Sequence, residues 1–325
     1  MKELLKYLRH YIKESILAPL FKMLEASFEL FVPLVMAAII DTGIKNSDKP
    51  YIFKMAMVLV GLAIVGFISA LTAQYFAAKA SVGFGKELRG DLYRHINTLS
   101  YSEIDKIGTS TLITRLTADV NQMQTAVNLF LRLFLRSPFI VIGAVVMAFT
   151  VDPKTAIIFA VSIPLLAAVV FGIMFYSVPI YKKVQNRLDS VMRITRENLS
   201  GVRVIRAFNH EQKEIEDFDK CSEELKDMQL YGCKISAYLN PITYVIVNLS
   251  IVLIIYVGGI RVNTGRLTQG EVISLINYMS QVLVELIKLS NLIINLTKSV
   301  ACGNRIYDVF KICLLYTSDA ADEAR

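Results

Sequence analysis

Apolar residues gather in six long spans along this 325-residue chain, and the connections between them differ greatly in length. Each span holds enough mostly apolar residues to cross a hydrocarbon core of about 30 Å, which takes a helix of roughly 20 residues. Only helices or closed barrels satisfy their backbone hydrogen bonds in lipid, and these spans are too long for barrel strands. The pattern therefore predicts an all-α membrane protein whose transmembrane helices cover residues 16–40, 53–78, 133–151, 155–180, 236–260 and 271–297.

Two of the connections, residues 80–136 and 181–235, are long, charged and free of proline, whereas the other three are short. Proline breaks or kinks a helix because it lacks an N–H and clashes with the preceding turn. Its absence lets the flanking spans continue as helices, and 20 to 25 further residues would reach roughly 30–37 Å beyond the bilayer. We expect each long connection to be a helical hairpin with a bend near its middle.

The two bends are predicted from local signals. In the first, Ser102 with Asp105 is typical of a helix start and Gly108 of a helix stop, which predicts a short helix across the tip. In the second, Asn209 is expected to cap a helix that resumes at Glu211. The candidate contact residues at the two tips are Tyr101, Ser102, Glu103, Ile104 and Asp105, and then Phe208, Asn209, His210 and Glu211.

The two ends of the chain differ in character from the spans. Residues 1–14 place apolar and basic side chains on opposite faces, which predicts an amphipathic helix at the membrane surface, or else a frayed start to the first span. Residues 313–325 show no apolar period, and we expect them to lie outside a six-helix domain over residues 15–312.

The net charge of +7 reflects orientation rather than nucleic-acid binding. Most of the 35 lysines and arginines lie in residues 1–13, in the two long connections and after the last span, with few in the short loops. Positively charged loops stay in the cytoplasm, so both termini and both hairpins are predicted to be cytoplasmic. No module that mixes aromatic and basic residues accompanies the charge, so no nucleic-acid partner is expected.

The sequence shows no catalytic, metal-binding or phosphate-binding motif. The three histidines are scattered, and Cys221, Cys233, Cys302 and Cys313 show neither Cys-x-x-Cys spacing nor an oxidising location, so neither a metal site nor a disulfide is expected. Gly83–Lys86 lacks the first glycine and the hydroxyl residue of a phosphate-binding loop. We expect no catalytic residue and no cofactor in this chain.

The sixth span carries a regular pattern of polar side chains. At 100° per residue its polar side chains form one stripe about 140° wide. Charged groups at membrane depth are costly unless they face a bundle interior or a water-filled cavity. The stripe is predicted to line a pathway, and polar contacts that hold helices together are the alternative. Its members are Asn277, Gln281, Glu285, Lys288, Asn291, Asn295 and Lys298.

The first span repeats this pattern. Lys22, Glu25 and Glu29 share one face, and Glu29, like Glu285, lies near the middle of its span. Two carboxylates at mid-membrane depth would favour cationic amphiphiles in a cavity, unless Lys22 and Lys288 neutralise them. Glu29 therefore joins the stripe as a candidate pathway residue.

Several segments together resemble the membrane domain of an ATP-binding-cassette (ABC) exporter of the six-helix, multidrug-export type. The likeness extends from the amphipathic start to Ile312 and rests on the order and spacing of its pieces. These are Ile39–Ile44 (IIDTGI), Tyr101–Asp105 (YSEID), Thr114–Val120 (TRLTADV), Glu197–Phe208 (ENLSGVRVIRAF), Gly265–Glu271 (GRLTQGE) and Arg305–Phe310 (RIYDVF).

The resemblance implies a type 1 transmembrane domain in the bacterial plasma membrane. The tips at residues 101–107 and about 207–212 would be coupling helices that dock on nucleotide-binding domains, in cis and in trans. Two half-transporters, identical or, slightly favoured, different, would exchange spans four and five and export a small molecule, lipid or peptide by alternating access. ATP and Mg²⁺ would bind the nucleotide-binding domains.

The sequence departs from that family where a nucleotide-binding domain would follow Phe310. We therefore expect no ATPase activity from the chain alone, and interpret it as a truncated half-transporter or as a membrane subunit separate from its ATPase. Two other functions stay open. An ion-coupled secondary transporter would not need two matched long hairpins, and a non-transporting membrane sensor or scaffold would carry a signalling domain.

Overall fold

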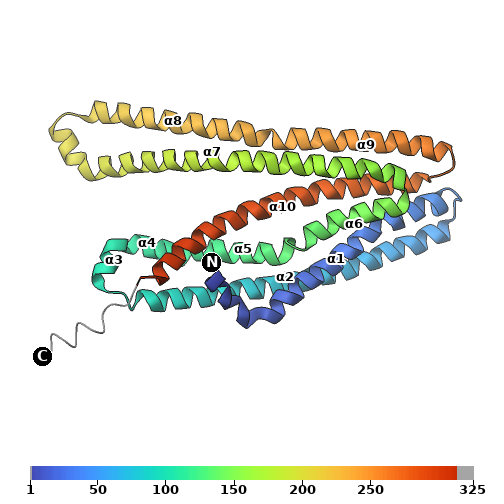
Figure 1. Cartoon of the computed structure of the whole chain (residues 1–325), viewed down its shortest axis with the longest axis horizontal. Helices are drawn as coiled ribbons and strands as arrows, with labels where there is room; N and C mark the ends of the chain where they lie inside the picture. The colour runs from blue at the N-terminus through green and yellow to red at the C-terminus, as the bar shows by residue number, and fades with distance from the viewer. Residues whose placement is uncertain (1, 313–325) are drawn as a thin grey trace. The chain divides into compact units, whose positions relative to one another are not determined.

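The computed structural model describes residues 2–312, and this part of the chain is helical apart from short turns (Figure 1). The predicted tail at residues 313–325 lies outside the described residues. In chain order the elements are η1 (Lys2–Tyr11), α1 (Ile12–Ala38), η2 (Ile39–Ile44), α2 (Lys49–Ile96), α3 (Tyr101–Ile107), α4 (Thr109–Thr114), η3 (Arg115–Asp119), α5 (Val120–Leu133), α6 (Arg136–Val151), α7 (Pro153–Ala207), α8 (Glu211–Ala237), α9 (Leu239–Asn263) and α10 (Gln269–Phe310).

The prediction of six membrane-spanning helices is confirmed within the described residues. Six helical stretches are long and apolar enough to cross a membrane. The predicted continuation beyond the bilayer is also confirmed, since α2 runs unbroken for 48 residues and α7 for 55. The stretches are Lys6–Ile44, Lys49–Ile96, Thr109–Val151, Pro153–Ala207, Glu211–Asn263 and Gln269–Phe310.

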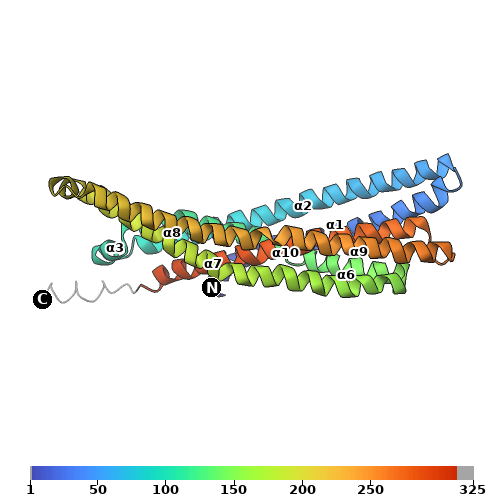
Figure 2. The same ribbon diagram turned by 90° about the horizontal axis from the view of Figure 1, so that it is seen from above.

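Two prolines interrupt helices that the sequence analysis expected to be continuous. A proline ring clashes with the carbonyl group four residues earlier and cannot donate to it. For Pro138 that carbonyl belongs to Phe134, where α5 gives way to α6. For Pro241 it belongs to Ala237, the last residue of α8, and α9 resumes nearly in line with α8 (Figure 2). Both breaks lie where the ring of a proline disfavours the preceding helical turn, although Pro164 and Pro179 are accommodated within α7.

The described residues divide into two compact units, and the first comprises residues 2–157 and 254–312. Small side chains let α1, α2 and α5 approach closely, with Ala18, Ala77 and Ala80 fully buried. Further along, η1, α2, α5 and α10 share an apolar core that includes Leu4, Leu88 and Ile306. The 3-10 helix η1 repeats every three residues, so Leu4 and Tyr7 both point into this core.

The second unit, residues 158–253, is an antiparallel hairpin in which α7 returns as α8 and α9 (Figure 1). Polar pairs recur along its length. Ser162 Oγ and Ser250 Oγ lie 2.7 Å apart in the apolar part. In the polar part the Tyr181 and Ser236 hydroxyls lie 3.0 Å apart, and the Arg187 guanidinium is 2.7 Å from Glu224. The hairpin is therefore held together by its own contacts.

Candidate functional site

The break between α5 and α6 places the side chain on which the candidate site is built. Because the helix restarts at Arg136, this residue and Ser137 occupy the first turn of α6. Both are buried inside the first unit. The free N–H groups at a helix start make it electropositive, which favours an acidic neighbour. Glu285 of α10 is that neighbour.

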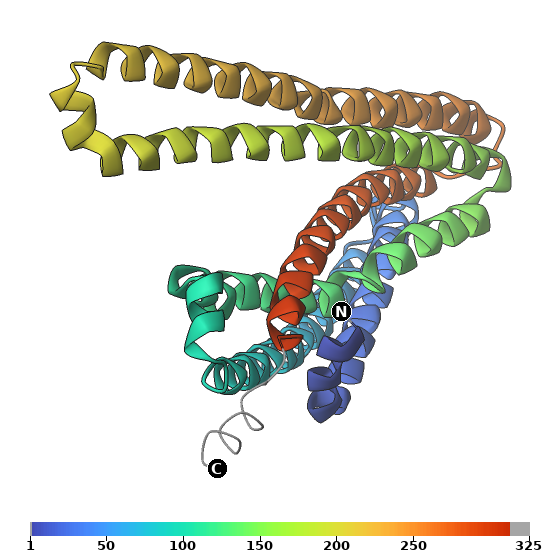
Figure 3. The ribbon, with the colours of Figure 1, turned by 60° about the vertical axis from the view of Figure 1, so that its left-hand side comes forward.

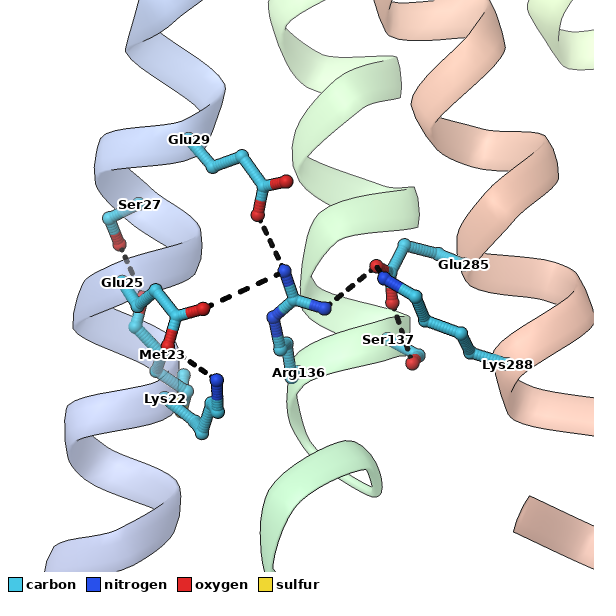
Figure 4. A network of polar contacts seen from close by, with 9 residues as sticks. All are labelled: Lys22, Met23, Glu25, Ser27, Glu29, Arg136, Ser137, Glu285 and Lys288. Carbon is cyan, nitrogen blue, oxygen red and sulfur yellow. Dashed lines mark hydrogen bonds and ion pairs between the residues drawn. The ribbon is translucent and has the colours of Figure 1, made fainter. Parts of the chain in front are cut away.

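Arg136 joins acidic side chains of α1 and α10 in one ion network (Figure 4). Its Nη1 atom donates to Glu285 Oε1 at 2.8 Å, and its Nη2 atom donates to Glu29 Oε2 at 2.6 Å. The Glu25 carboxylate lies farther off, with Oε1 at 3.9 Å from Nη2. One guanidinium thus links the first, third and sixth membrane spans.

Three further hydrogen bonds complete the network. Ser137 Oγ donates to Glu285 Oε2 at 2.8 Å, and Lys288 Nζ donates to Glu285 Oε1 at the same distance. Lys22 Nζ donates to Glu25 Oε2 at 2.5 Å. Glu285 is only 2% exposed, and a buried carboxylate is tolerated when such partners satisfy it. Glu285 and Lys288 thus form an ion pair three residues apart along α10.

A cavity of about 500 Å³ lies beside the network, inside the first unit. Five of the candidate pathway residues line it, and they come from both helices that the sequence analysis singled out. Asn291, Asn295 and Lys298 of the predicted stripe are not among the lining residues; the Asn295 amide donates to the Asn291 carbonyl at 2.9 Å. The cavity is lined by Glu29, Val32, Pro33, Met36, Ile140, Asn277, Ser280, Gln281, Val284, Glu285 and Lys288.

The sequence analysis did not single out Arg136. It counted this residue with the charged connection 80–136, at the edge of the third span. The signal that could have found it is Pro138, because a proline two residues later restarts the helix and turns Arg136 toward the bundle.

Tyr278 was also missed. Its buried hydroxyl donates to the Leu30 carbonyl at 2.7 Å and ties α10 to α1.

At the tip of the first hairpin, α3 lies across the end of α2, as predicted (Figure 3). Gly108 ends the helix with φ 85°, in a region that favours glycine, so the predicted stop is confirmed. The predicted start is wrong by two residues. The cap is Ser100, whose hydroxyl accepts from the Glu103 N–H at 3.3 Å, while Ser102 lies inside the helix.

At the tip of the second hairpin, α7 ends at Ala207 and α8 begins at Glu211, where the sequence placed its start. The predicted cap is wrong. Asn209 adopts a left-handed conformation, with φ 56°, and supplies the sharp turn rather than a capping bond. The position before α8 is His210, which makes no capping hydrogen bond. Phe208 is 72% exposed, so the aromatic side chain stands out from the tip.

The end of α10 is fastened to the first hairpin. Arg305 Nε donates to Asp119 Oδ2 at 2.9 Å, and Arg305 Nη2 donates to Asp119 Oδ1, so the pair is bidentate. Asp119 closes the π-helix η3 and is buried. One turn further along α10, the imidazole of His95 contacts the Val309 carbonyl at 3.0 Å. These contacts join the end of α10 to the first hairpin.

Short loops at the opposite end of the unit hold the helices by carboxylates. Asp41 of η2 accepts from the Gly270 N–H at 2.8 Å and from the Thr268 hydroxyl at 2.6 Å, so it caps α10 from a neighbouring helix. Asp152 accepts from Arg261 Nη2 at 2.6 Å and from the Thr155 N–H at 2.9 Å. Asp41 belongs to the IIDTGI segment, and this contact gives that segment a structural role.

The Asp152 carboxylate is buried, and burial alone would raise its pKa. The hydrogen bonds from the Thr155 hydroxyl and N–H, together with the Arg261 charge, outweigh burial and hold the pKa of Asp152 below its usual value. Across residues 2–312 the structure brings together no group of three His, Cys, Asp or Glu side chains that could hold a metal ion.

Six membrane-length helices, two hairpins and a cavity inside the helix bundle define a multi-pass α-helical membrane domain of the transporter class. Residues 15–286 match the family described as the ABC transporter transmembrane region. The chain belongs to this family, which confirms the resemblance drawn from its sequence.

The relatives agree with that assignment. The chain is 30% identical to YfiB, an uncharacterized ABC transporter ATP-binding protein of Bacillus subtilis, over 96% of this chain and 54% of YfiB. It is 29% identical to an uncharacterized ABC transporter ATP-binding protein of Mycobacterium tuberculosis, over 94% of this chain and 52% of the relative. The chain is 26% identical to an export ATP-binding/permease protein of Rickettsia felis, over 85% of this chain and 48% of the relative. The chain thus spans about half the length of these relatives.

Proposed function

We propose that this chain forms the substrate pathway of an ATP-driven exporter and couples it to cytoplasmic ATPase domains by alternating access. Membership of the ABC transporter transmembrane family supports this, as do relatives named as ATP-binding and export proteins. The single observation that carries the proposal is that α2 and α7 run unbroken from membrane-spanning segments to distant hairpin tips. Stiff helices of this kind transmit a push at the tip as rigid-body motion.

The two tips are the proposed contacts with the ATPase domains. Tyr101 in α3 is 88% exposed and Phe208 is 72% exposed, and large exposed apolar side chains commonly mark interaction sites. On this proposal the first tip comprises Tyr101–Asp105 and the second Phe208–Glu211. One tip would dock on the ATPase domain joined to or paired with the same chain, and the other on that of a partner half-transporter.

The self-contained hairpin supports the proposed exchange of spans between two half-transporters. Residues 158–253 include most of spans four and five and form a compact unit of their own. A hairpin held by internal pairs such as Ser162–Ser250 keeps its structure when it packs against a second chain. The partner would be the same chain or, slightly favoured, a related one.

The proposal also covers the orientation of the chain in the membrane, the site of ATP binding and the class of cargo. Both tips and both termini would lie in the cytoplasm of a bacterial cell, and the many lysines and arginines of the hairpins support this orientation. ATP and Mg²⁺ would bind the ATPase domains, because residues 2–312 present neither a phosphate-binding loop nor a metal-binding cluster. The cargo would be a small molecule, lipid or peptide.

The test uses inside-out vesicles that contain this chain together with its ATPase domains. We expect ATP-dependent accumulation of a fluorescent amphiphile, lost in Tyr101→Asp and Phe208→Asp because a charge replaces each exposed aromatic. Met192→Asp is the matched control, since Met192 is exposed on α7 away from the tip. Accumulation that follows an ion gradient without ATP, or that survives both tip substitutions together, would contradict the proposal.

A further inference from the structure

The charges around the cavity balance one another. The network contains the cations Lys22, Arg136 and Lys288 and the anions Glu25, Glu29 and Glu285, so it carries no net charge. A ligand with a single charge would leave an unbalanced charge in surroundings of low dielectric, which is costly. This balance removes the reason to expect a simple cation in the cavity.

Only some of these charges are within reach of a ligand. Glu285 is nearly fully buried, whereas the side chains of Glu29 and Lys288 are 41% and 39% exposed and both line the cavity. They come from α1 and α10, on either side of Arg136 (Figure 4). A ligand in the cavity therefore meets one accessible carboxylate and one accessible ammonium group.

One further polar atom on the cavity lining has no hydrogen-bond partner among the described residues. Gln281 Oε1 is buried and accepts no hydrogen bond from any residue that the structure describes. An unsatisfied buried acceptor is costly until a donor reaches it. A ligand N–H group supplies such a donor. The lining also has an apolar part, to which Val32 and Met36 of α1 and Val284 of α10 belong.

We propose that this cavity binds a zwitterionic amphiphile, with its amine directed to Glu29 and Gln281, its acidic group to Lys288 and its chain on the apolar wall. Such a ligand brings no net charge into the network and pairs with both accessible charges. The volume of about 500 Å³ lies within the range of small-molecule pockets, which favours a single-chain ligand. This inference rests on the proposed function and names its substrate class.

The test measures binding to the purified chain in detergent, without ATP. The probes are fluorescent amphiphiles that share one alkyl chain and end in an amine, a carboxylate, a neutral amide, or an amine with a carboxylate. A fifth probe, with an amine and a phosphodiester, distinguishes a lipid head group from an amino-acid head group. We expect either zwitterion to bind at least tenfold more tightly than the singly charged probes.

Variants then assign the two ends of the ligand. Glu29→Gln is expected to shift the preference toward the carboxylate probe, and Lys288→Gln toward the amine probe. Lys298→Gln is the matched control, because Lys298 lies on α10, is exposed and does not line the cavity. Thermal unfolding of each variant shows whether it remains folded.

Several results would overturn the inference: the amine probe binding as tightly as the zwitterions, a ranking unchanged in both variants, or no binding of any zwitterion. These outcomes are separate from failure of the proposed function. If zwitterions bind but no probe accumulates with ATP, the proposed exporter function is wrong and the proposed binding site stands. If other amphiphiles accumulate with ATP but no zwitterion binds, the exporter function stands and the proposed binding site is wrong.

Discussion

At the scale of single residues, Arg136 holds the membrane part of the first unit together. It is the cation that both Glu29 and Glu285 share, and Glu285 is buried. Removing one member of a buried ion pair leaves an uncompensated charge and costs about 3–5 kcal/mol. We therefore expect Arg136→Ala to lower the thermal unfolding temperature of the detergent-solubilised protein strongly.

The control for this prediction separates charge from packing. In Arg136→Leu combined with Glu285→Leu, no charge is left buried alone, and replacing a buried pair by apolar residues is often neutral. We expect the double variant to recover most of the lost stability. An equal loss in the single and double variants would mean that the network does not act through its charges.

Asp152 gives a prediction about pH. Because its folded pKa lies below the value of about 3.9 for an unfolded aspartate, the carboxylate stabilises the fold fully above that pH. The contribution is lost as the pH falls through the lower, folded pKa. The gap in unfolding temperature between the native chain and Asp152→Asn should be widest near pH 7 and narrow below about pH 4. A gap independent of pH would contradict the assigned Arg261 and Thr155 contacts.

Part of the candidate site could be predicted from sequence, and the rest could not. The periodicity of the sixth span identified Glu285 and Lys288, because a polar stripe on an apolar helix is visible without a structure. Arg136 adjoins a charged connection, and only the helix break before it turns its side chain inward. Its partners, Glu29 and Glu285, are distant in sequence, so no local signal joins them.

At the scale of elements, the cap of α3 gives a direct comparison of prediction and structure. Both Ser100 and Ser102 precede an acidic residue by three positions, so sequence alone did not decide between them. The structure selects Ser100 because its backbone is extended, with φ −68° and ψ 153°, while Ser102 is already helical. The long spans were predictable because apolar length is averaged over many residues, whereas caps depend on one backbone angle.

We expect Ser100→Ala to destabilise α3 by about 1 kcal/mol, the usual cost of losing a side-chain cap. Hydrogen–deuterium exchange should then show faster exchange of the amides of Tyr101–Ile107. Ser102→Ala is the matched control and should change exchange little. Faster exchange in Ser102→Ala alone would restore the cap that the sequence suggested.

At the scale of the whole molecule, the continuity of α7 gives a prediction about transmission. Asn186 lies in the polar part of α7 and is exposed. Asn186→Pro would remove one backbone hydrogen bond and strain the turn before it, at a cost of about 3 kcal/mol. With the ATPase domains present, we expect ATP hydrolysis to continue while accumulation in vesicles falls. Asn186→Ala should leave both rates near normal, and equal transport in the two variants would contradict transmission through α7.

The length of α7 also sets the scale of the motion that it could transmit. Its 55 residues rise about 80 Å along the helix axis, at 1.5 Å per residue. Rotation of such a rod by about 5° around one end displaces the other end by about 7 Å, which is within the range of subunit and domain rearrangements. A displacement of this size at the tip between α7 and α8 would thus need only a slight change in the tilt of α7 near its other end.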